Sequence, residues 1–271
     1  MKKNVDTPYA KVSIGQHWLD DDKSLEAMCD GAEITKGDHV LEIGPGHGSL
    51  TKKLIDRGAS VTAVELDKDL TYELKGKFSG ENFRLYLGNI LQFDFNSLPP
   101  GYKVVANIPY YLTSNILRIL CESPNPFSMA AILVQKEVAE RVAAMPGDMS
   151  LLSVSVQFYC NTGLGPKVPA KLFSPPPKVD SEILLLQHTG PKFVDINKTQ
   201  FFQLVKAGFS ERRKKLTNSL SGGYNISKKD AKHILETAGI NPHKRAQELT
   251  LTDWHNLYLV VNNAPTPAPT N

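Results

Sequence analysis

A regular alternation of short apolar runs with helix-length amphipathic segments, between residues 36 and 187, constrains the fold most strongly. Segments 48–57 and 68–77 have the spacing of amphipathic helices. The runs that predict strands lie at 39–43, 60–65, 83–87, 103–107, 130–135 and 183–187. Strands separated by helices form a mainly parallel sheet with helices on both faces. We therefore predict an α/β fold, within which residues 151–159 fit a strand or a helix.

A break in this pattern near residue 190 predicts a second domain. His188-Thr189-Gly190-Pro191 has the composition of a junction. Helical spacing then recurs in segments 199–209, 228–238 and 251–261. We expect Thr252 to cap the last of these helices. The predicted organisation is an α/β domain over 1–190, a small all-helical domain over 191–263, and a Pro-rich disordered tail over 264–271.

Composition excludes several classes of protein. The chain has 271 residues, of which 41% are hydrophobic, enough for a sizeable core in each of two domains. Cys29, Cys121 and Cys160 are far apart and form no pair with ligand spacing, so neither a disulfide framework nor a metal site is expected. No segment approaches the roughly 20 apolar residues of a membrane span. We expect a cytoplasmic protein with free thiols.

Basic residues gather toward the C-terminal end. Between residues 195 and 263 there are 11 basic and 6 acidic side chains, whereas the whole chain carries a net charge of only +3. Arg212, Arg213, Lys214 and Lys215 are consecutive. On a helix four such side chains cannot share one face, so at least two are expected to face solvent or a ligand. A short basic run is usually only solvated, but the charge of the whole region favours phosphate contact.

A glycine-rich turn follows the first predicted strand. Glu42-Ile43-Gly44-Pro45-Gly46-His47-Gly48 allows a sharp turn and a close approach of a ligand to the backbone, particularly at Gly44 and Gly46. Glu65 ends the next strand, where a carboxylate can accept both hydroxyls of a ribose. A dinucleotide fingerprint would place a third glycine at position 49, which is Ser49. The spacing therefore favours an adenosine cofactor without a pyrophosphate, such as S-adenosylmethionine.

A second motif, Asn107-Ile108-Pro109-Tyr110, ends the strand at 103–107 and so lies at the same edge of the sheet. The Asn107 side-chain carbonyl and the Ile108 main-chain carbonyl can each accept a hydrogen bond from a planar exocyclic amine. Pro109 stiffens the turn, and Tyr110 offers a ring for base stacking. The simpler alternative, a turn that merely ends a strand, is less favoured downstream of the glycine loop.

The chain resembles a known family over residues 11–261. The motifs that carry the resemblance occur in the family's order: 15–19 (GQHWL), 42–46 (EIGPG), 65–67 (ELD), 107–110 (NIPY), 135–138 (QKEV), 173–181 (FSPPPKVDS) and 209–216 (FSERRKKL). We identify it as similar to the ribosomal RNA adenine N6,N6-dimethyltransferases, in particular the bacterial small-subunit branch. The resemblance implies a Rossmann-like S-adenosylmethionine-dependent methyltransferase domain with a helical domain after it.

The same resemblance implies a reaction and a set of site residues. The family converts two adjacent adenosines near the 3′ end of 16S rRNA to N6,N6-dimethyladenosine in the immature 30S subunit. Its cofactor contacts correspond to His17, Leu19, Gly44, Glu65, Asn89 and Asn107. Phe173 corresponds to an aromatic that stacks on the target adenine opposite Tyr110. The run at 212–215 would contact RNA, and we expect a monomer without a metal.

Two positions depart from the family's commonest pattern. His17 stands where Asn is usual, and Asn89 stands where an Asp receives the amine of the cofactor's adenine. An Asn carbonyl can accept that hydrogen bond, but without charge assistance. We therefore expect cofactor binding to be retained and weaker than with an Asp.

Three alternatives stay open. The first is the antibiotic-resistance branch that methylates large-subunit rRNA, which shares the glycine loop and the Asn-x-Pro-Tyr signature. The second is a non-catalytic ribosome-assembly factor with the same fold, against which the intact motifs argue. The third, a nicotinamide dehydrogenase, is disfavoured by Ser49.

Overall fold

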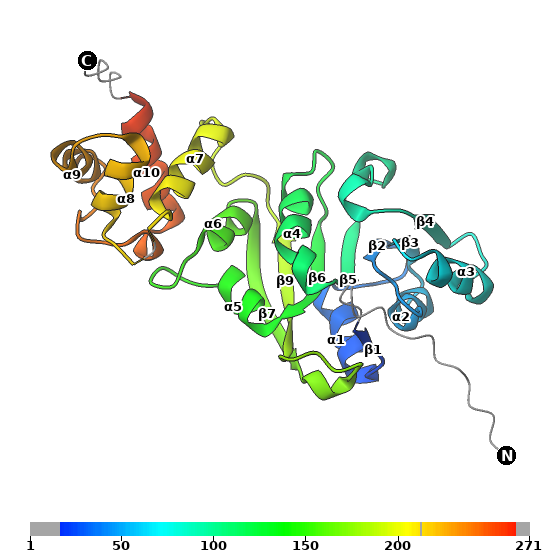
Figure 1. The fold of residues 1–271 in the computed structure, drawn as a ribbon. Coiled ribbons are helices and arrows are strands. Elements are labelled where there is room, and N and C mark those ends of the chain that lie inside the picture. Colours follow the sequence, from blue (N-terminus) through cyan, green and yellow to red (C-terminus); the bar gives the residue numbers. More distant parts are fainter. Residues whose placement is uncertain (1–16, 212, 264–271) are drawn as a thin grey trace. The chain divides into compact units, whose positions relative to one another are not determined.

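The computed structural model describes residues 17–211 and 213–263 (Figure 1). These residues divide into two compact units, each described here by itself. The first unit comprises residues 17–139 and 161–188, and the second comprises 140–160 and 189–263. The expected tail, 264–271, lies outside the described residues. Within the described ranges, none of the helices has the length and apolar character needed to cross a bilayer.

A seven-stranded sheet forms the centre of the first unit. Its order is β4 (Phe83–Leu87), β3 (Ser60–Glu65), β2 (His39–Ile43), β5 (Lys103–Asn107), β6 (Met129–Gln135), β9 (Ser181–His188) and β7 (Cys160–Val168). The first five strands are parallel, and β9 runs antiparallel to β6. This confirms the predicted α/β sheet and the predicted bounds of its first four strands in the chain. Strand β2 has β3 on one side and β5 on the other, so the chain runs from β2 to β3 and β4 on one side of β2 and then returns from β4 to β5 on its other side. This arrangement leaves a crevice at the carboxyl ends of the strands, which is the usual ligand site of such sheets.

Strand β7 is absent from the sequence prediction, and its partner explains why. Asn161 Nδ2 donates to Gln187 Oε1 at 3.2 Å. Farther along, a Cβ on Gly163 would lie 3.7 Å from Leu185 Cβ, and one on Gly165 would lie 3.1 Å from Ile183 Cβ. Residue numbers fall along β9 as they rise along β7, so the pairing is antiparallel. The glycines admit the bulky side chains of β9, but they carry no strand signal of their own.

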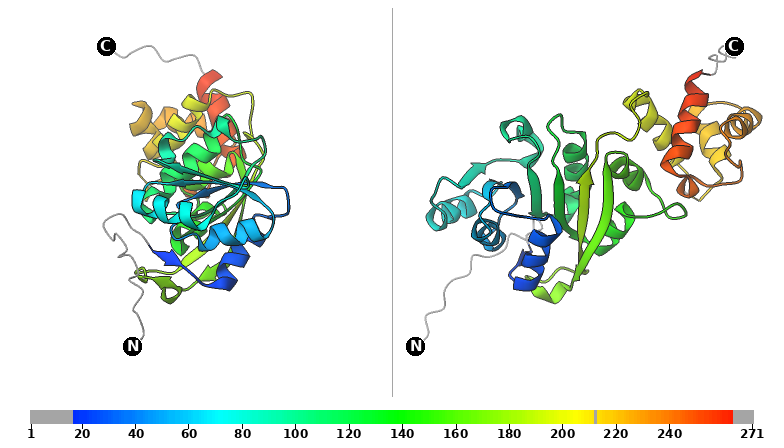
Figure 2. Two further views of the ribbon diagram at one scale, coloured as in Figure 1. Left: turned by 90° about the vertical axis from the view of Figure 1, so that its right-hand side faces the viewer. Right: turned by 180° about the vertical axis from the view of Figure 1, so that it is seen from behind.

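Helices cover both faces of this sheet (Figures 1 and 2). The helices of the first unit are α1 (Asp22–Gly31), α2 (Ser49–Asp56), α3 (Lys68–Lys77), α4 (Thr113–Glu122) and the start of α5 (Lys136–Val142). Single 3₁₀ turns are η2 (Ile90–Gln92), η3 (Phe95–Ser97), η4 (Tyr110–Leu112) and η5 (Ala170–Leu172). A separate two-stranded ladder pairs β1 (Trp18–Leu19) with β8 (Phe173–Ser174).

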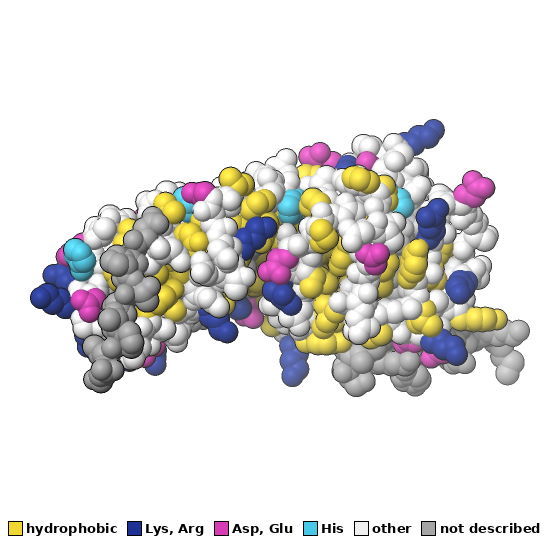
Figure 3. Space-filling view, turned by 90° about the horizontal axis from the view of Figure 1, so that it is seen from above, with side chains coloured by type: hydrophobic (Ala, Val, Ile, Leu, Met, Phe, Trp, Pro, Cys, Tyr) yellow, Lys and Arg dark blue, Asp and Glu magenta, His cyan; other side chains and the backbone are white. Residues whose placement is uncertain are grey.

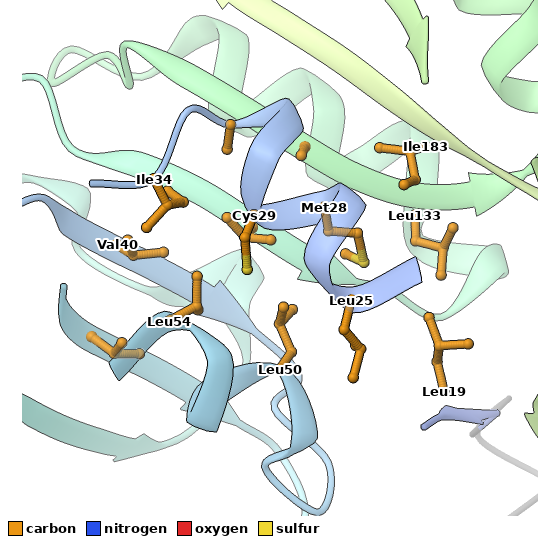
Figure 4. Packing of buried hydrophobic residues seen from close by; sticks show 14 of the residues in the cluster. Leu19, Leu25, Met28, Cys29, Ile34, Val40, Leu50, Leu54, Leu133 and Ile183 are labelled. Atoms are coloured by element: carbon orange, nitrogen blue, oxygen red, sulfur yellow. The ribbon is translucent and has the colours of Figure 1, made fainter. Parts of the chain in front are cut away.

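One buried cluster fixes α1 and α2 on the sheet (Figure 4). Met28 and Cys29 of α1 and Leu54 of α2 are fully buried against the apolar side chains of the strands. The strand residues that meet them are Val40, Val61, Ala63, Val105, Ala131, Leu133 and Ile183. Side chains alternate between the faces of a strand, so these residues share one face of the sheet. Helix α2 is thereby held directly after the glycine turn.

The second unit is helical. It contains α6 (Leu151–Gln157), α7 (Lys198–Gly208), α8 (Leu216–Tyr224), α9 (Lys228–Thr237), the turn η6 (Ala246–Glu248) and α10 (Leu251–Asn263). The three predicted C-terminal helices are thus confirmed. Within the segment 151–159, residues Leu151–Gln157 form a helix, which a capping box of Ser150 and Ser153 begins.

Two details of the second unit differ from the sequence pattern. Residues 140–160, inside the predicted 1–190 domain, pack in this unit because the Phe158 ring lies 5.2 Å from Phe201 and 5.3 Å from Phe202. The cap of α10 is Thr250 rather than Thr252: Thr250 Oγ1 accepts from Asp253 N at 2.9 Å, and Asp253 Oδ2 accepts from Thr250 N at 2.9 Å. This reciprocal pair satisfies two donors that Thr252 could not reach from inside the helix.

Candidate active site

A cleft opens at the carboxyl ends of β2, β3 and β5. It encloses about 1150 Å³, the part open to solvent included. Four segments line it: the β1 region, the turn after β2, the end of β3 with the turn after β4, and the loop after β5. Ten predicted site residues lie along it: His17, Leu19, Gly44, Gly46, Glu65, Asn89, Asn107, Ile108, Pro109 and Tyr110. Residues from distant parts of the chain therefore meet in one crevice of the size typical of ligand sites.

The glycine turn adopts a backbone that other residues rarely take. Gly44 and Gly46 have φ angles of +67° and +57°, in the left-handed region. Gly44 N donates to Val64 O at 3.0 Å, so the turn is anchored to β3. A Cβ on Gly46 would lie 3.2 Å from Trp18 Cδ1. The turn therefore needs glycine, because a side chain at Gly46 would be strained and would press on the Trp18 ring.

Glu65 ties the end of β3 to this turn. Its side chain is only 6% exposed. Oε1 accepts a hydrogen bond from Asp67 N at 2.8 Å, and Oε2 accepts one from Gly46 N at 3.4 Å. Burial raises the pKa of Glu65, while these backbone donors oppose the rise. The carboxyl is thus oriented at the cleft wall, where it can accept the hydroxyls of a ribose.

Glu42 of β2 is a second carboxyl in the wall, one that the sequence marked only as part of a motif. It is 1% exposed, and its Oε2 accepts from Thr51 Oγ1 at 2.6 Å. Its Oε1 is buried and receives no hydrogen bond from the described residues. Burial raises the pKa of Glu42 to about 8, and the nearby Glu65 charge adds to the rise. In the sequence, the sign of a functional role for Glu42 was a carboxyl next to apolar residues in the run 40–43.

The Asn107 side chain is held by the backbone of His17. Asn107 Nδ2 donates to His17 O at 3.1 Å, which leaves Oδ1 as the acceptor end of the amide. Tyr110 follows in η4, and its hydroxyl lies 2.7 Å from Ser181 Oγ at the start of β9. Burial raises the pKa of Tyr110, so the ring is a neutral platform. The sequence motif thus becomes a fixed acceptor beside a fixed aromatic ring.

His17, one of the two residues that depart from the family pattern, contacts both of these groups. Its ring lies 5.9 Å from the Tyr110 ring, with 24° between the planes. Its Nδ1 is 2.8 Å from Pro175 O. A carbonyl oxygen only accepts, so Nδ1 carries the proton and Nε2 of the neutral ring is an acceptor.

Asn89 lies at the cleft in the turn after β4, where it caps η2. Its Oδ1 accepts a hydrogen bond from Leu91 N at 3.0 Å. The amide oxygen is therefore already directed to the backbone, and the NH₂ group occupies the other end of the side chain. An Asp in this conformation would keep the same cap and present a second oxygen instead.

Two predicted groups are not among the residues that line the cleft. Phe173, in β8, is 4% exposed and packs in the core cluster opposite Leu19, and it is absent from the residues that line the cleft. Arg213, Lys214 and Lys215 belong to the second unit, in the turn before α8 rather than on a helix, while Arg212 lies outside the described residues. Tyr111, which the sequence did not single out, lines the cleft with 61% of its surface exposed.

The three basic side chains of this turn are exposed, and two have local partners. Lys214 Nζ lies 2.9 Å from Glu211 Oε2, and Lys215 Nζ lies 2.9 Å from His243 Nδ1. Figure 3 shows lysine and arginine side chains projecting from the surface, with acidic side chains among them. Among the described residues, no group of three or more His, Cys, Asp or Glu side chains is arranged to hold a metal ion.

The cleft has the charge of a site for a cationic adenosine cofactor. Asp20, Glu42 and Glu65 line it, and no Lys or Arg is among the described residues that do. A pyrophosphate would be repelled there, whereas a sulfonium would be attracted. The glycine turn, the oriented Glu65 and the buried Oε1 of Glu42, which has no hydrogen-bond partner among the described residues, fit S-adenosylmethionine.

Solved structures share this fold over most of the chain. A crystal structure of a dimethyladenosine transferase from Plasmodium falciparum has a TM-score of 0.77 and 27% identity, covering 91% of this chain and 98% of that one. A crystal structure of the 23S rRNA methyltransferase ErmE has a TM-score of 0.72 and 27% identity, covering 91% and 100%. The fold and the cleft define an S-adenosylmethionine-dependent methyltransferase.

The family is narrower than that class. Residues 9–263 match the model for ribosomal RNA adenine dimethylases, and the chain belongs to that family. Ribosomal RNA small subunit methyltransferase A of Dehalococcoides mccartyi is 40% identical over 263 residues, covering 94% of this chain and 90% of the relative. The chain is therefore an enzyme that methylates adenine in ribosomal RNA, and its methyl donor is S-adenosylmethionine.

Proposed function

We propose that the enzyme methylates N6 of two adjacent adenosines near the 3′ end of 16S rRNA, in the immature small subunit, to give N6,N6-dimethyladenosine. It would act as a monomer in the cytoplasm. The observation that carries the proposal is the Asn107 amide, whose nitrogen is held by His17 O at 3.1 Å while its oxygen remains an acceptor. The 40% identity to a small-subunit methyltransferase supports the choice of ribosomal subunit.

The chemistry requires placement more than a strong base. The lone pair of an adenine N6 is delocalised into the ring, so the amine is a poor nucleophile. Acceptance of its two hydrogens by Asn107 Oδ1 and the Ile108 carbonyl would direct the lone pair and stabilise the positive charge that develops on nitrogen. The bound cofactor supplies the electrophilic methyl group. Because the attacked nitrogen becomes acidic only after transfer, orientation accounts for several kcal/mol of the barrier.

Base capture would use the aromatic side chains near Asn107. A base taken out of its stack regains roughly 1–3 kcal/mol on each aromatic plane that it meets. Tyr110 is fixed for this role by Ser181. The expected second platform, Phe173, is buried in this structure, so stacking on it would require β8 to move.

The second unit would hold RNA phosphates. Arg213, Lys214 and Lys215 are exposed in one turn, and the 195–263 region carries 11 basic against 6 acidic residues. Arg212, outside the described residues, belongs to the same proposed set. Phosphate contacts of this kind position a protein on RNA without reading its sequence.

Mass spectrometry of rRNA incubated with isotopically labelled S-adenosylmethionine tests the proposal. Immature small subunits and protein-free 23S rRNA are offered separately to the wild type and to Asn107→Ala. The expected result is dimethyladenosine at two adjacent positions of 16S rRNA with the wild type, and subunit binding without methyl transfer for Asn107→Ala. Methylation of 23S rRNA alone would favour the large-subunit activity that the ErmE likeness makes the second candidate. Binding without any methylation by the wild type would instead indicate an assembly factor.

A further inference from the structure

The described cleft residues contain no Lys or Arg to balance the buried carboxyl of Glu42. Glu42 is 1% exposed, its Oε1 has no hydrogen-bond partner among the described residues, and no Lys or Arg is among those that line the cleft. A carboxylate in such a place is disfavoured, because burial removes its hydration and the hydrogen bonds from Thr51 replace only part of it. Without a cation beside Glu42 the neutral acid is favoured, and a bound cation would favour the carboxylate instead.

We propose that Glu42 distinguishes the sulfonium cofactor from its uncharged thioether product, by releasing a proton when the sulfonium binds and regaining one after the methyl group has left. The inference concerns cofactor binding, so it rests on the methyltransferase assignment and not on the identity of the RNA. Glu42 acts here as a charge-sensing residue of the cofactor site.

Among the groups around Glu42, we expect Glu42 itself to change its protonation when a cation binds. Thr51 of α2 donates its hydroxyl to Oε2 at 2.6 Å and does not titrate. Glu65, at the end of β3, carries a like charge and opposes ionisation of Glu42. Cys29 of α1 stays a neutral thiol, because burial raises its pKa to about 12. The other ionisable cleft residues are His17, His47, Asp20, Tyr110 and Tyr111, of which Asp20 and Tyr111 are exposed.

The pKa of Glu42 places the exchange near neutral pH. Because burial raises this pKa to about 8, the free enzyme is mostly protonated at pH 7. A cation in the cleft favours the carboxylate and lowers that pKa. One proton then leaves Glu42 for solvent as the sulfonium binds. Methyl transfer moves the carbon from sulfur to N6, N6 loses one proton, and the neutral thioether permits Glu42 to take one proton back.

This exchange gives a binding signature that does not depend on catalysis. If binding releases one proton, the association constant rises up to tenfold per pH unit below the pKa of the free group. S-adenosylhomocysteine has the same adenosine, amino and carboxyl groups as the cofactor but lacks the positive sulfur. The ratio of the two dissociation constants therefore isolates the effect of the sulfonium.

Isothermal titration calorimetry of the full chain, without RNA, measures the proton directly. Each ligand is titrated at pH 7 in two buffers of different ionisation enthalpy, into the wild type, Glu42→Gln and Asp20→Asn. The amino groups of the ligands titrate equally against all three proteins, so differences between proteins report on the substituted carboxyl. In Glu42→Gln the amide oxygen can still accept from Thr51, and in Asp20→Asn an exposed cleft carboxyl is removed as a matched control.

For the wild type and Asp20→Asn, we expect S-adenosylmethionine to release roughly one proton more than S-adenosylhomocysteine, since a group of pKa about 8 is mostly protonated at pH 7. For Glu42→Gln, the two ligands should release equal numbers. Sinefungin, which carries an amine in place of the sulfonium, should behave like the cofactor. Equal proton release by both ligands in the wild type would overturn the proposal, even if Glu42→Gln fails to fold. A difference that persists in folded Glu42→Gln would overturn it as well.

Discussion

Replacement of Asn89 by Asp should tighten cofactor binding. Asn89 Oδ1 caps η2 through Leu91 N at 3.0 Å, and Asp is an equally good cap, so the local backbone should stay in place. The change converts the outward NH₂ group into a carboxylate oxygen at the position where the family receives the adenine amine. A hydrogen bond to a charged group contributes about 1.5–3 kcal/mol before the cost of desolvating the carboxylate, whereas the Asn89 NH₂ group is a donor and offers the adenine amine no acceptor.

The net gain is about 1 kcal/mol, which corresponds to a roughly fivefold lower dissociation constant for S-adenosylhomocysteine at pH 7.5. Isothermal titration calorimetry measures it, with thermal unfolding as a check on the fold. Asp94→Asn is the matched control, because Asp94 caps η3 in the same way, through Asn96 N at 3.0 Å, and does not line the cleft. That variant should bind like the wild type. An Asn89→Asp protein that binds the ligand no better than the wild type would refute the reasoning.

Four further predictions follow from the same geometry. Tyr110→Phe removes the 2.7 Å bond to the buried Ser181 and should cost about 1 kcal/mol of stability in urea unfolding, with slower single-turnover methylation at unchanged cofactor affinity. Leu54→Ala, at a fully buried site, should cost about 2–5 kcal/mol in the same measurement. Neutralising the exposed residues 213–215 with Gln should weaken subunit binding and flatten its salt dependence, without changing cofactor affinity in filter-binding assays. Because the pKa of Glu42 is raised in the folded state, its contribution to stability is complete below the usual pKa of 4.5 and is lost as the pH rises to about 8. The unfolding temperature of the wild type should therefore decline over that range, and Glu42→Gln should flatten the decline. An unchanged decline in Glu42→Gln would count against the burial argument.

The sequence predicted the central sheet because four of its five parallel strands are apolar runs buried on both faces, and the edge strand β4, though partly exposed, keeps an apolar run. Strands β2, β3, β4 and β5 have the bounds that their apolar runs indicate. Strand β7 was missed because it contains Gly163, Gly165 and Pro166, and its place depends on Ile183 and Leu185 across the ladder. Helix α8 was missed for a similar reason, since Gly222 and Gly223 lower its intrinsic helix propensity.

The site was predictable in its motifs but not in its contacts. Glycine spacing and the position of Glu65 indicated an adenosine cofactor, because those features are local in the chain. The raised pKa of Glu42, the cap made by Asn89 and the burial of Phe173 arise from segments distant in sequence that pack together. The hydrophobic periodicity of a sequence does not show whether the oxygen of an amide side chain already accepts a hydrogen bond. In Asn89 that oxygen accepts one from Leu91 N, and this decides which group the side chain offers to a ligand.

His17 contacts both fixed groups of the site, the Asn107 amide and the Tyr110 ring. Its carbonyl oxygen receives Asn107 Nδ2, and its ring stacks on Tyr110. A nucleobase that displaces the imidazole would also disturb the amide, and a change at the amide would be transmitted back to the ring. The nitrogen resonances of this single imidazole, followed by NMR spectroscopy in selectively labelled protein, would therefore report donor binding and RNA engagement in one spectrum.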